Sequence, residues 1–256
     1  MLRACNVSLS YGGDEPVLEG ASLEIQAGQF VSLVGPSGSG KSSLLRAIMG
    51  LQATSGGTIE TTGLAPNDIG ILFQDDALLP WRTAIENVAL GLKLRGRDRK
   101  QASAEAEEWL DRLSLSGFGE RYPRELSGGQ RKRVALAQVL ALKPRLLLMD
   151  EPFASLDAIV RARVTQDVVD LVEGGGISVL LVTHDLEEAI ALSDRVYLLS
   201  QGPRAHISQC YTIPIPRPRN FMRARTHPKF APLLERLWAD LSEAVDGPSR
   251  VVAEAA

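Results

Sequence analysis

The chain has 256 residues, and its 28 lysines and arginines stand against 31 aspartates and glutamates, which gives a net charge of -3. This balance disfavours a strongly basic nucleic-acid binder, so we expect no nucleic-acid partner. A hydrophobic content of 45 % is enough to fill a core. No uncharged apolar stretch approaches the ~20 residues that cross a bilayer, so we expect no membrane span in this chain.

The beginning of the chain predicts a β-rich region. Residues 7–9, 17–18 and 21–25 are short β-prone runs separated by turns, which favours antiparallel strands. Residues 29–34 are apolar and partly β-branched and end at Gly35 and Pro36, so they predict a buried strand.

The pattern becomes helical between about residues 84 and 143. Trp109, Leu110 and Leu113 fall at helical spacing within an alanine- and glutamate-rich segment, and residues 134–142 form a further helical run. Near-continuous apolar runs then follow at residues 145–149, 178–182 and 195–199. Such runs are typical of a parallel sheet covered on both faces, so the chain reads as α/β with a helical insertion between strands.

The second half also predicts helices and an extended tail. Residues 158–173 form a predicted helix that ends at three glycines, and Asp185 is a plausible N-cap for a helix over residues 186–192. Residues 213–219 contain three prolines and must be extended. Residues 230–245 predict a final amphipathic helix.

For the two cysteines and for a cationic run in the tail, the sequence favours a structural role over a functional one. Cys5 and Cys210 lie far apart in the sequence, which predicts two small buried hydrophobic residues rather than a disulfide or a metal site. A cationic run in the tail predicts a solvated surface, with contact to acidic headgroups or a membrane subunit as the alternative. The run comprises Arg217, Arg219, Arg223, Arg225 and Lys229.

Residues 35–42 read Gly-Pro-Ser-Gly-Ser-Gly-Lys-Ser and fit the phosphate-loop pattern G-x-x-x-x-G-K-[ST] between a strand and a helix. Glycines let backbone N–H groups converge on phosphate oxygens, and the helix N-terminus adds positive potential. We expect Lys41 to reach the β- and γ-phosphates and Ser42 to complete the coordination of Mg²⁺. The alternative is a glycine-rich turn that matches by chance. The expected ATP-binding residues here are Gly35, Pro36, Ser37, Gly38, Ser39, Gly40, Lys41, Ser42 and Ser43.

An acidic pair follows the apolar run at residues 145–149. Asp150 fits a carboxylate that organises Mg²⁺, and Glu151 is placed to accept a proton from water. An acidic pair after a strand is often only a solvated loop start. The apolar run favours the functional interpretation, because it places the pair beside the phosphate loop.

Residues 126–130 read Leu-Ser-Gly-Gly-Gln and open a helix, with Ser127 near the N-cap. Gly128 and Gly129 leave backbone N–H groups uncovered, so this is a second anion-binding helix terminus. At this point the chain resembles the ATP-binding subunits of ABC transporters over roughly residues 1–200. The resemblance implies an α/β P-loop NTPase of the ABC ATPase type. Its mixed sheet core is flanked by helices, with an N-terminal antiparallel β region and a helical subdomain inserted at about residues 84–143.

The resemblance also implies a domain division and a dimer. Residues 1–202 would form the ATPase domain and residues 203–256 a C-terminal extension. Two copies would sandwich ATP head to tail, with the signature segment of one copy facing the phosphate loop of the other. The signature segment comprises Leu126, Ser127, Gly128, Gly129 and Gln130. Ser155, Leu156 and Asp157 resemble the loop that crosses this dimer interface.

Other positions take roles from the same resemblance. Tyr11 resembles the aromatic residue that stacks on adenine, with a core tyrosine at a strand end as the alternative. Gln74 resembles the glutamine that senses Mg²⁺ and the attacking water. His184 resembles the histidine that touches the γ-phosphate, although a lone histidine is more often structural. The implied catalytic residues are Glu151, His184 and Gln74, and the implied metal ligands are Ser42, Gln74 and Asp150.

A finer resemblance concerns Leu79, Pro80 and Trp81, which together with residues 86–91 look like the nitrate, sulfonate and taurine group of bacterial importers. That group includes carriers of a thiamine pyrimidine precursor. These three residues would then dock on an integral membrane permease subunit, with Trp81 in the helical core as the alternative. The resemblance places the chain at the cytoplasmic face of the inner membrane, with a periplasmic solute-binding protein as an indirect partner.

Other functions stay open from the sequence. The ATPase of an efflux or lipid-moving complex would look nearly identical, and a soluble ABC ATPase or a small-molecule kinase is a further alternative. Gln138 stands where the family usually has arginine, which removes no catalytic group.

Overall fold

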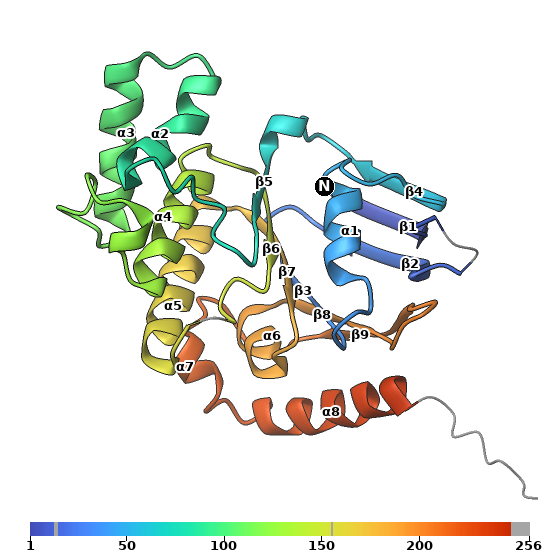
Figure 1. Cartoon of the computed structure of the whole chain (residues 1–256). Helices are drawn as coiled ribbons and strands as arrows, with labels where there is room; N and C mark the ends of the chain where they lie inside the picture. Colours follow the sequence, from blue (N-terminus) through green and yellow to red (C-terminus); the bar gives the residue numbers. More distant parts are fainter. Residues whose placement is uncertain (13–14, 155, 247–256) are drawn as a thin grey trace, which may run out of the picture.

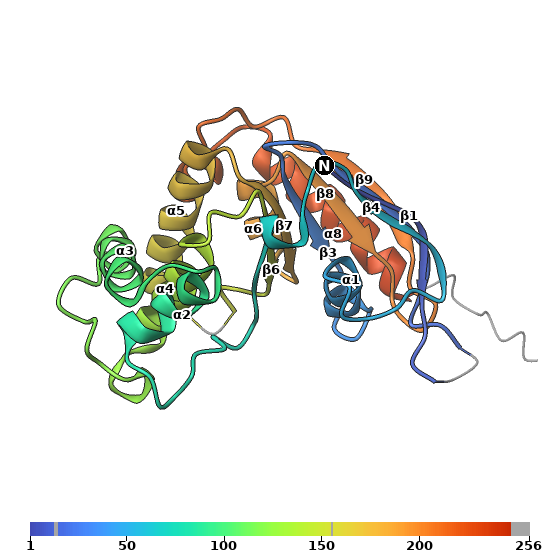
Figure 2. The same ribbon diagram turned by 90° about the horizontal axis from the view of Figure 1, so that it is seen from above.

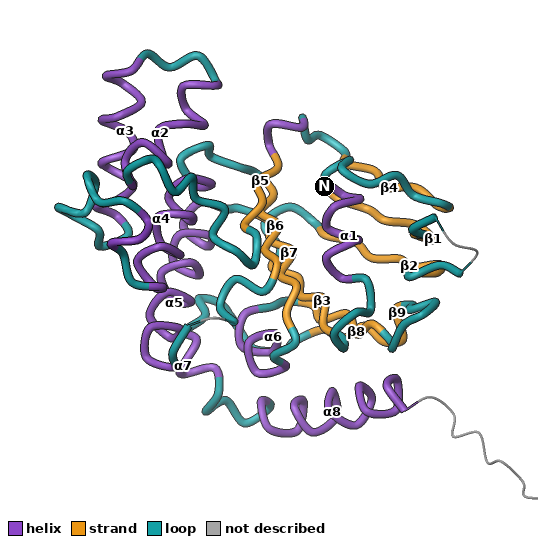
Figure 3. The backbone as a smooth tube through the Cα atoms, viewed as in Figure 1, coloured by secondary structure: helices purple, strands orange, loops and turns teal. Residues whose placement is uncertain are grey.

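The computed structural model describes residues 1–12, 15–154 and 156–246, and it contains two sheets with helices between and around them (Figures 1 and 3). The strands are β1 (Leu2–Leu9), β2 (Leu18–Ile25), β3 (Phe30–Val34), β4 (Gly56–Thr61), β5 (Ile69–Leu72), β6 (Leu146–Asp150), β7 (Ser178–Thr183), β8 (Arg195–Leu199) and β9 (Ile207–Thr212). The helices are α1 (Lys41–Ile48), α2 (Ala84–Leu94), α3 (Arg99–Arg112), α4 (Gly128–Leu140), α5 (Ala158–Gly175), α6 (Leu186–Leu192), α7 (Phe221–Ala224) and α8 (Phe230–Asp246). None of the described helices has an apolar stretch long enough to span a bilayer.

The larger sheet has the strand order β5-β6-β7-β3-β8-β9. Its first five strands are parallel, and β9 runs antiparallel to β8 at the edge. The four apolar runs of the sequence become the neighbouring strands β6, β7, β3 and β8, and β3 and β7 are buried along their whole length. Their predicted place in the middle of a parallel sheet is confirmed.

The smaller sheet is antiparallel, with the order β2-β1-β4. The predicted short strands at residues 17–18 and 21–25 are wrong as separate elements, because the structure joins them in β2. The pairing of β1 and β2 shifts between Val7–Ala21 and Leu9–Leu18, and Gly20 has a φ of 64° at this irregularity. A bulge of this kind needs an unusual backbone conformation, which glycine supplies. Gly20 therefore interrupts the β-prone pattern of the sequence, although the strand continues through it.

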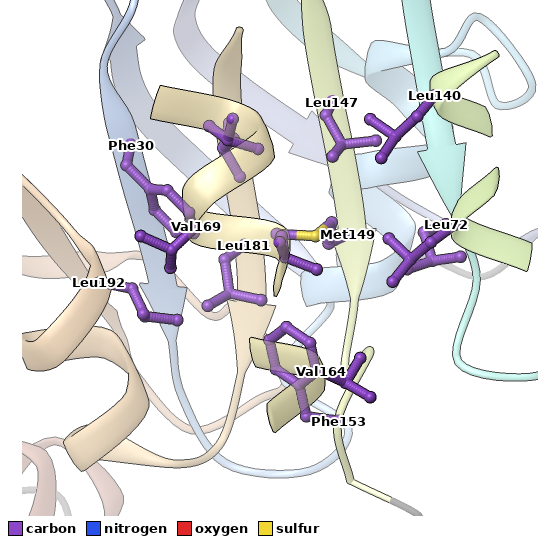
Figure 4. Close-up of a cluster of buried hydrophobic side chains, with 14 of the residues drawn as sticks. Phe30, Leu72, Leu140, Leu147, Met149, Phe153, Val164, Val169, Leu181 and Leu192 are labelled. Atoms are coloured by element: carbon purple, nitrogen blue, oxygen red, sulfur yellow. The ribbon is translucent and has the colours of Figure 1, made fainter. Parts of the chain in front are cut away.

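The helices divide between the two faces of the larger sheet (Figure 2). Helix α1 packs between the two sheets, and its Leu44 and Leu45 share one buried cluster with side chains from both. Helices α2 to α8 contribute to a second cluster on the opposite face. In Figure 4, Val164 and Val169 of α5 lie against strand side chains such as Leu181. The carboxyl ends of β3, β6 and β7 are thereby held at one edge of the sheet.

Three helices lie within the stretch predicted to be helical. Helices α2, α3 and α4 begin at side-chain caps from Thr83, Asp98 and Ser127, which explains where each of them starts. All three lie between β5 and β6 in the chain. No finding tests the domain boundaries themselves, so the subdomain at about residues 84–143 and the division at residue 202 stay predictions. Strand β9 pairs with β8 across the position of that second boundary.

The tail after β9 is tied to the core by Arg219, which is only 5 % exposed. Its guanidinium donates to Asp194 Oδ1 and to the Leu192 carbonyl, both at 2.9 Å, and Asp194 also pairs with Arg217 at 2.6 Å. Arg225 pairs with Glu187 at 3.1 Å. The expectation of a solvated cationic run is therefore wrong for Arg219, whose acidic partner lies far away in the sequence.

We expect Arg219→Ala to lower the free energy of unfolding by about 3 kcal/mol, because it removes one partner of a buried ion pair. Arg223→Ala is the matched control, since Arg223 is exposed on the same segment, and its effect should stay within about 0.5 kcal/mol. Urea unfolding measures both variants. Equal effects of the two substitutions would contradict the stabilising role of the contacts that Arg219 makes with the core.

The burial predicted for the cysteines is also wrong. Cys5 is half-buried and Cys210 is exposed. Cys210 lies on β9, which is the edge strand of its sheet, and only Tyr211 of that strand is fully buried. An edge strand with one open face leaves its outward side chains in water.

Candidate functional site

The phosphate loop, residues 35–42, runs from the end of β3 into α1. Gly38 and Gly40 have φ values of 79° and 93°, a region that L side chains rarely adopt. A Cβ atom on Gly35 would lie 2.8 Å from the Leu199 carbonyl oxygen of β8. The glycines are thus required for the tight curl of the loop and for its close approach to the sheet.

Lys41 is the first residue of α1 and is only 5 % exposed. Its Nζ donates to the carbonyl oxygens of Gly35 at 2.8 Å and Pro36 at 2.7 Å. Burial lowers the pKa of the Lys41 ammonium, while the nearby charges of Glu151 and Asp150 raise it. The ammonium therefore lies folded over the loop, beside the two carboxylates.

Ser42 and Asp150 come together from α1 and the end of β6. The Ser42 hydroxyl donates to Asp150 Oδ1 at 3.0 Å. Burial raises the pKa of the Asp150 carboxyl, whereas the Ser42 hydrogen bond lowers it. A hydroxyl and a carboxylate supply the oxygen ligands that Mg²⁺ prefers, together with phosphate oxygens and water. These side chains fit the expected metal site. Within the described residues, no group of three or more His, Cys, Asp or Glu side chains could hold a metal by protein ligands alone.

Glu151 and His184 face each other across neighbouring strands. Glu151 Oε2 lies 3.1 Å from His184 Nδ1. Glu151 has a φ of 43°, and its N–H donates to the Val182 carbonyl at 2.9 Å. The residue after β6 is thereby pinned to the end of β7. A non-glycine residue at positive φ is uncommon, and here it stands where the two predicted catalytic side chains meet.

A cavity of about 470 Å³ brings many of the predicted residues together. Tyr11 lines it at 55 % exposure, and its hydroxyl contacts Ser43 Oγ and Gln52 Oε1 at 2.7 Å each. The alternative of a core tyrosine is therefore wrong. The described lining residues are Tyr11, Val17, Ser37, Gly38, Gly40, Lys41, Ser42, Ser43, Gln74 and Glu151.

The signature segment, residues 126–130, lies apart from this cavity: none of the described lining residues belongs to it. The predicted cap is confirmed, because the Ser127 side chain accepts from the Gln130 N–H at the start of α4. A Cβ atom on Gly129 would lie 2.4 Å from Cγ1 of Val160, so this glycine packs directly against α5. A Cβ atom on Gly128 would meet only the far end of Arg131.

The predicted interface loop adjoins this contact. Asp157 caps α5 by accepting from the Val160 N–H at 3.1 Å, and Leu156 is buried. Ser155 lies outside the described residues. Ile159 follows at the start of α5 and is 84 % exposed. An exposed apolar side chain thus lies near the signature segment.

The predicted docking residues, Leu79, Pro80 and Trp81, lie in the segment between β5 and α2. Trp81 is 69 % exposed, so the alternative of a core tryptophan is wrong. The fully buried Asn87 holds this segment: its side chain accepts from the Leu79 N–H at 2.8 Å and donates to three carbonyls. A groove of about 300 Å³ adjoins the segment; its lining includes Phe73, Ala77, Leu90, Leu94 and Gln138.

Asn87 and Glu188 are two residues that the sequence analysis did not single out. Glu188 is 3 % exposed and lies one helical turn after His184, with Oε2 at 3.1 Å from Thr183 Oγ1. The only signal in the sequence is that Glu188 directly precedes the apolar run of residues 189–192, while acids and a histidine precede it. A charged residue in such a setting is rarely fully buried without a partner.

The carboxyl of Glu188 makes the stability pH-dependent. Burial raises its pKa to about 7 from 4.5, and the charge of Asp185 adds to the rise. The folded state therefore binds this proton more tightly than the unfolded state. The resulting stabilisation is complete below pH 4.5 and is lost as the pH rises through 7. We expect a loss of about 3 kcal/mol of unfolding free energy from this group between pH 4.5 and pH 8.

Glu188→Gln isolates this effect, because the amide has the same shape and does not titrate. Urea unfolding at several pH values should show that the advantage of the wild type over the variant declines as the pH rises. An identical pH dependence for the two proteins would contradict the shifted titration.

The comparisons with known proteins agree on one family. Residues 18–154 match the family described as ABC transporter. The nitrate import ATP-binding protein NrtC of Synechococcus elongatus is 40 % identical, over 88 % of this chain and 35 % of its own length, so the chain spans about a third of that relative. The aliphatic sulfonates import ATP-binding protein SsuB of Albidiferax ferrireducens is 45 % identical, over 84 % of this chain and 75 % of its own. The dimeric post-hydrolysis structure of the ATP-binding cassette MJ0796 bound to ADP and Pi superposes with a TM-score of 0.74 at 33 % identity, covering 83 % of this chain and 99 % of that one.

Proposed function

Because the chain belongs to the ABC transporter family, we propose that it hydrolyses ATP and couples this reaction to the uptake of a small solute through separate membrane subunits. One observation carries the proposal. The cavity of about 470 Å³ joins the phosphate loop to Gln74, Glu151 and Tyr11, so groups for binding and for hydrolysis share one space. Ser42 reaches Asp150 at the same place.

The phosphate loop binds the triphosphate. Its backbone N–H groups and the N-terminus of α1 offer positive potential to the phosphate oxygens. Lys41 exchanges its contacts with the loop carbonyls for contacts with phosphate, since a charged acceptor forms the stronger hydrogen bond. Tyr11, exposed beside Ser43, offers an aromatic face to the adenine.

Glu151 and His184 serve the hydrolysis step. Glu151 accepts a proton from the attacking water, and His184, 3.1 Å from that carboxylate, orients it and faces the γ-phosphate. Ser42, Asp150 and Gln74 would hold Mg²⁺, which neutralises the charge of the phosphates when it is bound. The protein thus contributes positioning and electrostatics, which dominate phosphoryl transfer.

A second copy of the chain completes the site. The N-terminus of α4, with Ser127 and Gly128, can attract an anion but lies away from the cavity of its own chain. In a head-to-tail dimer it faces the γ-phosphate bound by the partner copy. The exposed Ile159, close to the contact between Gly129 and Val160, gives this surface an apolar element suited to burial. ATP then stabilises the closed dimer, and hydrolysis removes the bridging phosphate.

The membrane permease subunit docks at Leu79, Pro80 and Trp81 beside the groove of about 300 Å³. Asn87 keeps this segment in one conformation, which reduces the entropy lost on binding. The relatives named for nitrate and sulfonate import suggest an oxyanion of this type, with taurine-like solutes or a thiamine pyrimidine precursor as finer possibilities. The chain would act at the cytoplasmic face of the inner membrane, in a system with a periplasmic solute-binding protein.

Capture of membrane subunits tests the transport part of the proposal. We expect Trp81→Ala to weaken this binding roughly thirtyfold, or about 2 kcal/mol, because it removes an exposed aromatic anchor. Trp238→Ala is the matched control, since Trp238 of α8 is also exposed, at 57 %. Detergent-solubilised membranes of the source cells, passed over each immobilised protein, provide the measurement. If Trp81→Ala retained as much integral membrane protein as the wild type does, Trp81 would not be part of the docking surface.

A further inference from the structure

The loop that carries His184 joins the end of β7 to the start of α6. The imidazole is 57 % exposed, and its Nδ1 lies 3.1 Å from Glu151 Oε2. Packing therefore contributes little to holding the ring beside Glu151. Its place must come from the backbone on either side.

That backbone is tied by two buried side chains. Thr183 Oγ1 accepts from the Asp185 N–H at 3.0 Å and lies 3.1 Å from Glu188 Oε2. Thr183 and Glu188 are both 3 % exposed. Asp185 Oδ1 in turn accepts from the N–H groups of Glu187 and Glu188, at 2.9 Å and 3.1 Å. These contacts enclose the residue before His184, the residue after it and the first turn of α6.

The carboxyl of Glu188 has an unfavourable electrostatic environment. The charged groups that act on it are Asp185 at the start of its own helix, Arg161 of α5 and Arg225 just after α7. Both arginines pair with other acids: Arg161 with Asp185 at 3.8 Å and Arg225 with Glu187 at 3.1 Å. Among the described residues, none forms an ion pair with Glu188. Burying an ionised acid without such a partner costs stability. The position of Glu188 against Thr183 is therefore not explained by a gain in folding stability.

We propose that Glu188 is a positioning residue, which through the Thr183 hydroxyl fixes the backbone on both sides of His184 and so holds the imidazole against Glu151. The role in turnover rests on the ATP hydrolysis proposed above. The role in placing the imidazole does not depend on it.

Glu188→Ala tests the effect on turnover. We expect kcat for ATP to fall about tenfold, because displacement of a reacting group by a fraction of an ångström is costly, while the Kd for ATP changes less than twofold. Glu188→Gln should keep at least half of kcat, since the amide can still bond to Thr183. Thr183→Val should match Glu188→Ala, and neither should reduce kcat further in a His184→Ala background. Glu187→Ala changes a half-buried acid of the same turn, whose carboxylate pairs with Arg225 rather than with Thr183; it is the control and should leave kcat unchanged.

A second readout is independent of hydrolysis. The chain has three histidines, so the His184 imidazole resonance can be assigned with His184→Ala. This resonance should move in Glu188→Ala and Thr183→Val and stay in place in Glu187→Ala. An unmoved resonance, or a Glu188→Ala variant with normal kcat, would overturn the inference. A wild-type protein without ATP hydrolysis would instead refute the proposed function, and the resonance would still decide the positioning role.

Discussion

Glu151→Gln is expected to bind ATP like the wild type and to release phosphate about 10²–10⁴-fold more slowly, because it loses the general base. The amide keeps the size of the side chain, so the cavity and the phosphate loop stay intact. ATP should then accumulate between two copies of the chain, and the dimer should persist. Phosphate release, ATP binding and the molar mass in the presence of ATP and Mg²⁺ measure the three consequences.

The control for this variant is Glu108→Gln, which changes an exposed acid on α3 outside the cavity. It should match the wild type in all three measurements. Turnover at the wild-type rate in Glu151→Gln would remove Glu151 from the role of base.

Lys41→Ala is expected to weaken ATP binding itself, by about 10–100-fold, because it removes a charge-assisted hydrogen bond to phosphate worth about 1.5–3 kcal/mol. Hydrolysis falls as a consequence of lost binding. Among the described residues, Lys41 bonds to loop carbonyls and forms no ion pair, so the substitution breaks none of the ion pairs there. Equilibrium binding of a fluorescent ATP analogue measures the effect.

Lys143→Ala is the matched control, since Lys143 is an exposed lysine that pairs with Glu105, away from the cavity. Its ATP affinity should equal that of the wild type. Unchanged affinity in Lys41→Ala would count against the assignment of residues 35–42 as a phosphate loop.

The predicted fold class agrees with the observed one because the strongest signals in the sequence are local. The apolar runs that became β3, β6, β7 and β8 are buried on both faces, which leaves a continuous hydrophobic pattern. The sequence pattern does not predict strand β5, because this strand is short and contains Gly70. A Cβ atom there would lie 2.6 Å from Val139 of α4, so the glycine serves the packing of a helix on the strand rather than the strand itself.

The candidate site was predictable to the extent that its residues form continuous motifs. The phosphate loop, the acidic pair after β6 and the cap at Ser127 each combine a residue pattern with a strand or helix end. The burial of Arg219 and its ion pair with Asp194 were not predictable, since the two residues lie 25 positions apart in the sequence. The same holds for the contact between Glu188 and the end of β7, which depends on the turn between β7 and α6 rather than on composition.

The structure of Glu151→Gln with ATP and Mg²⁺ tests most directly whether each pocket is built from two chains. We expect two copies, with each triphosphate held by Lys41 of one chain and by the start of α4, at Ser127, of the other. A nucleotide touched by a single chain, with Ser127 of every copy facing water, would contradict the account.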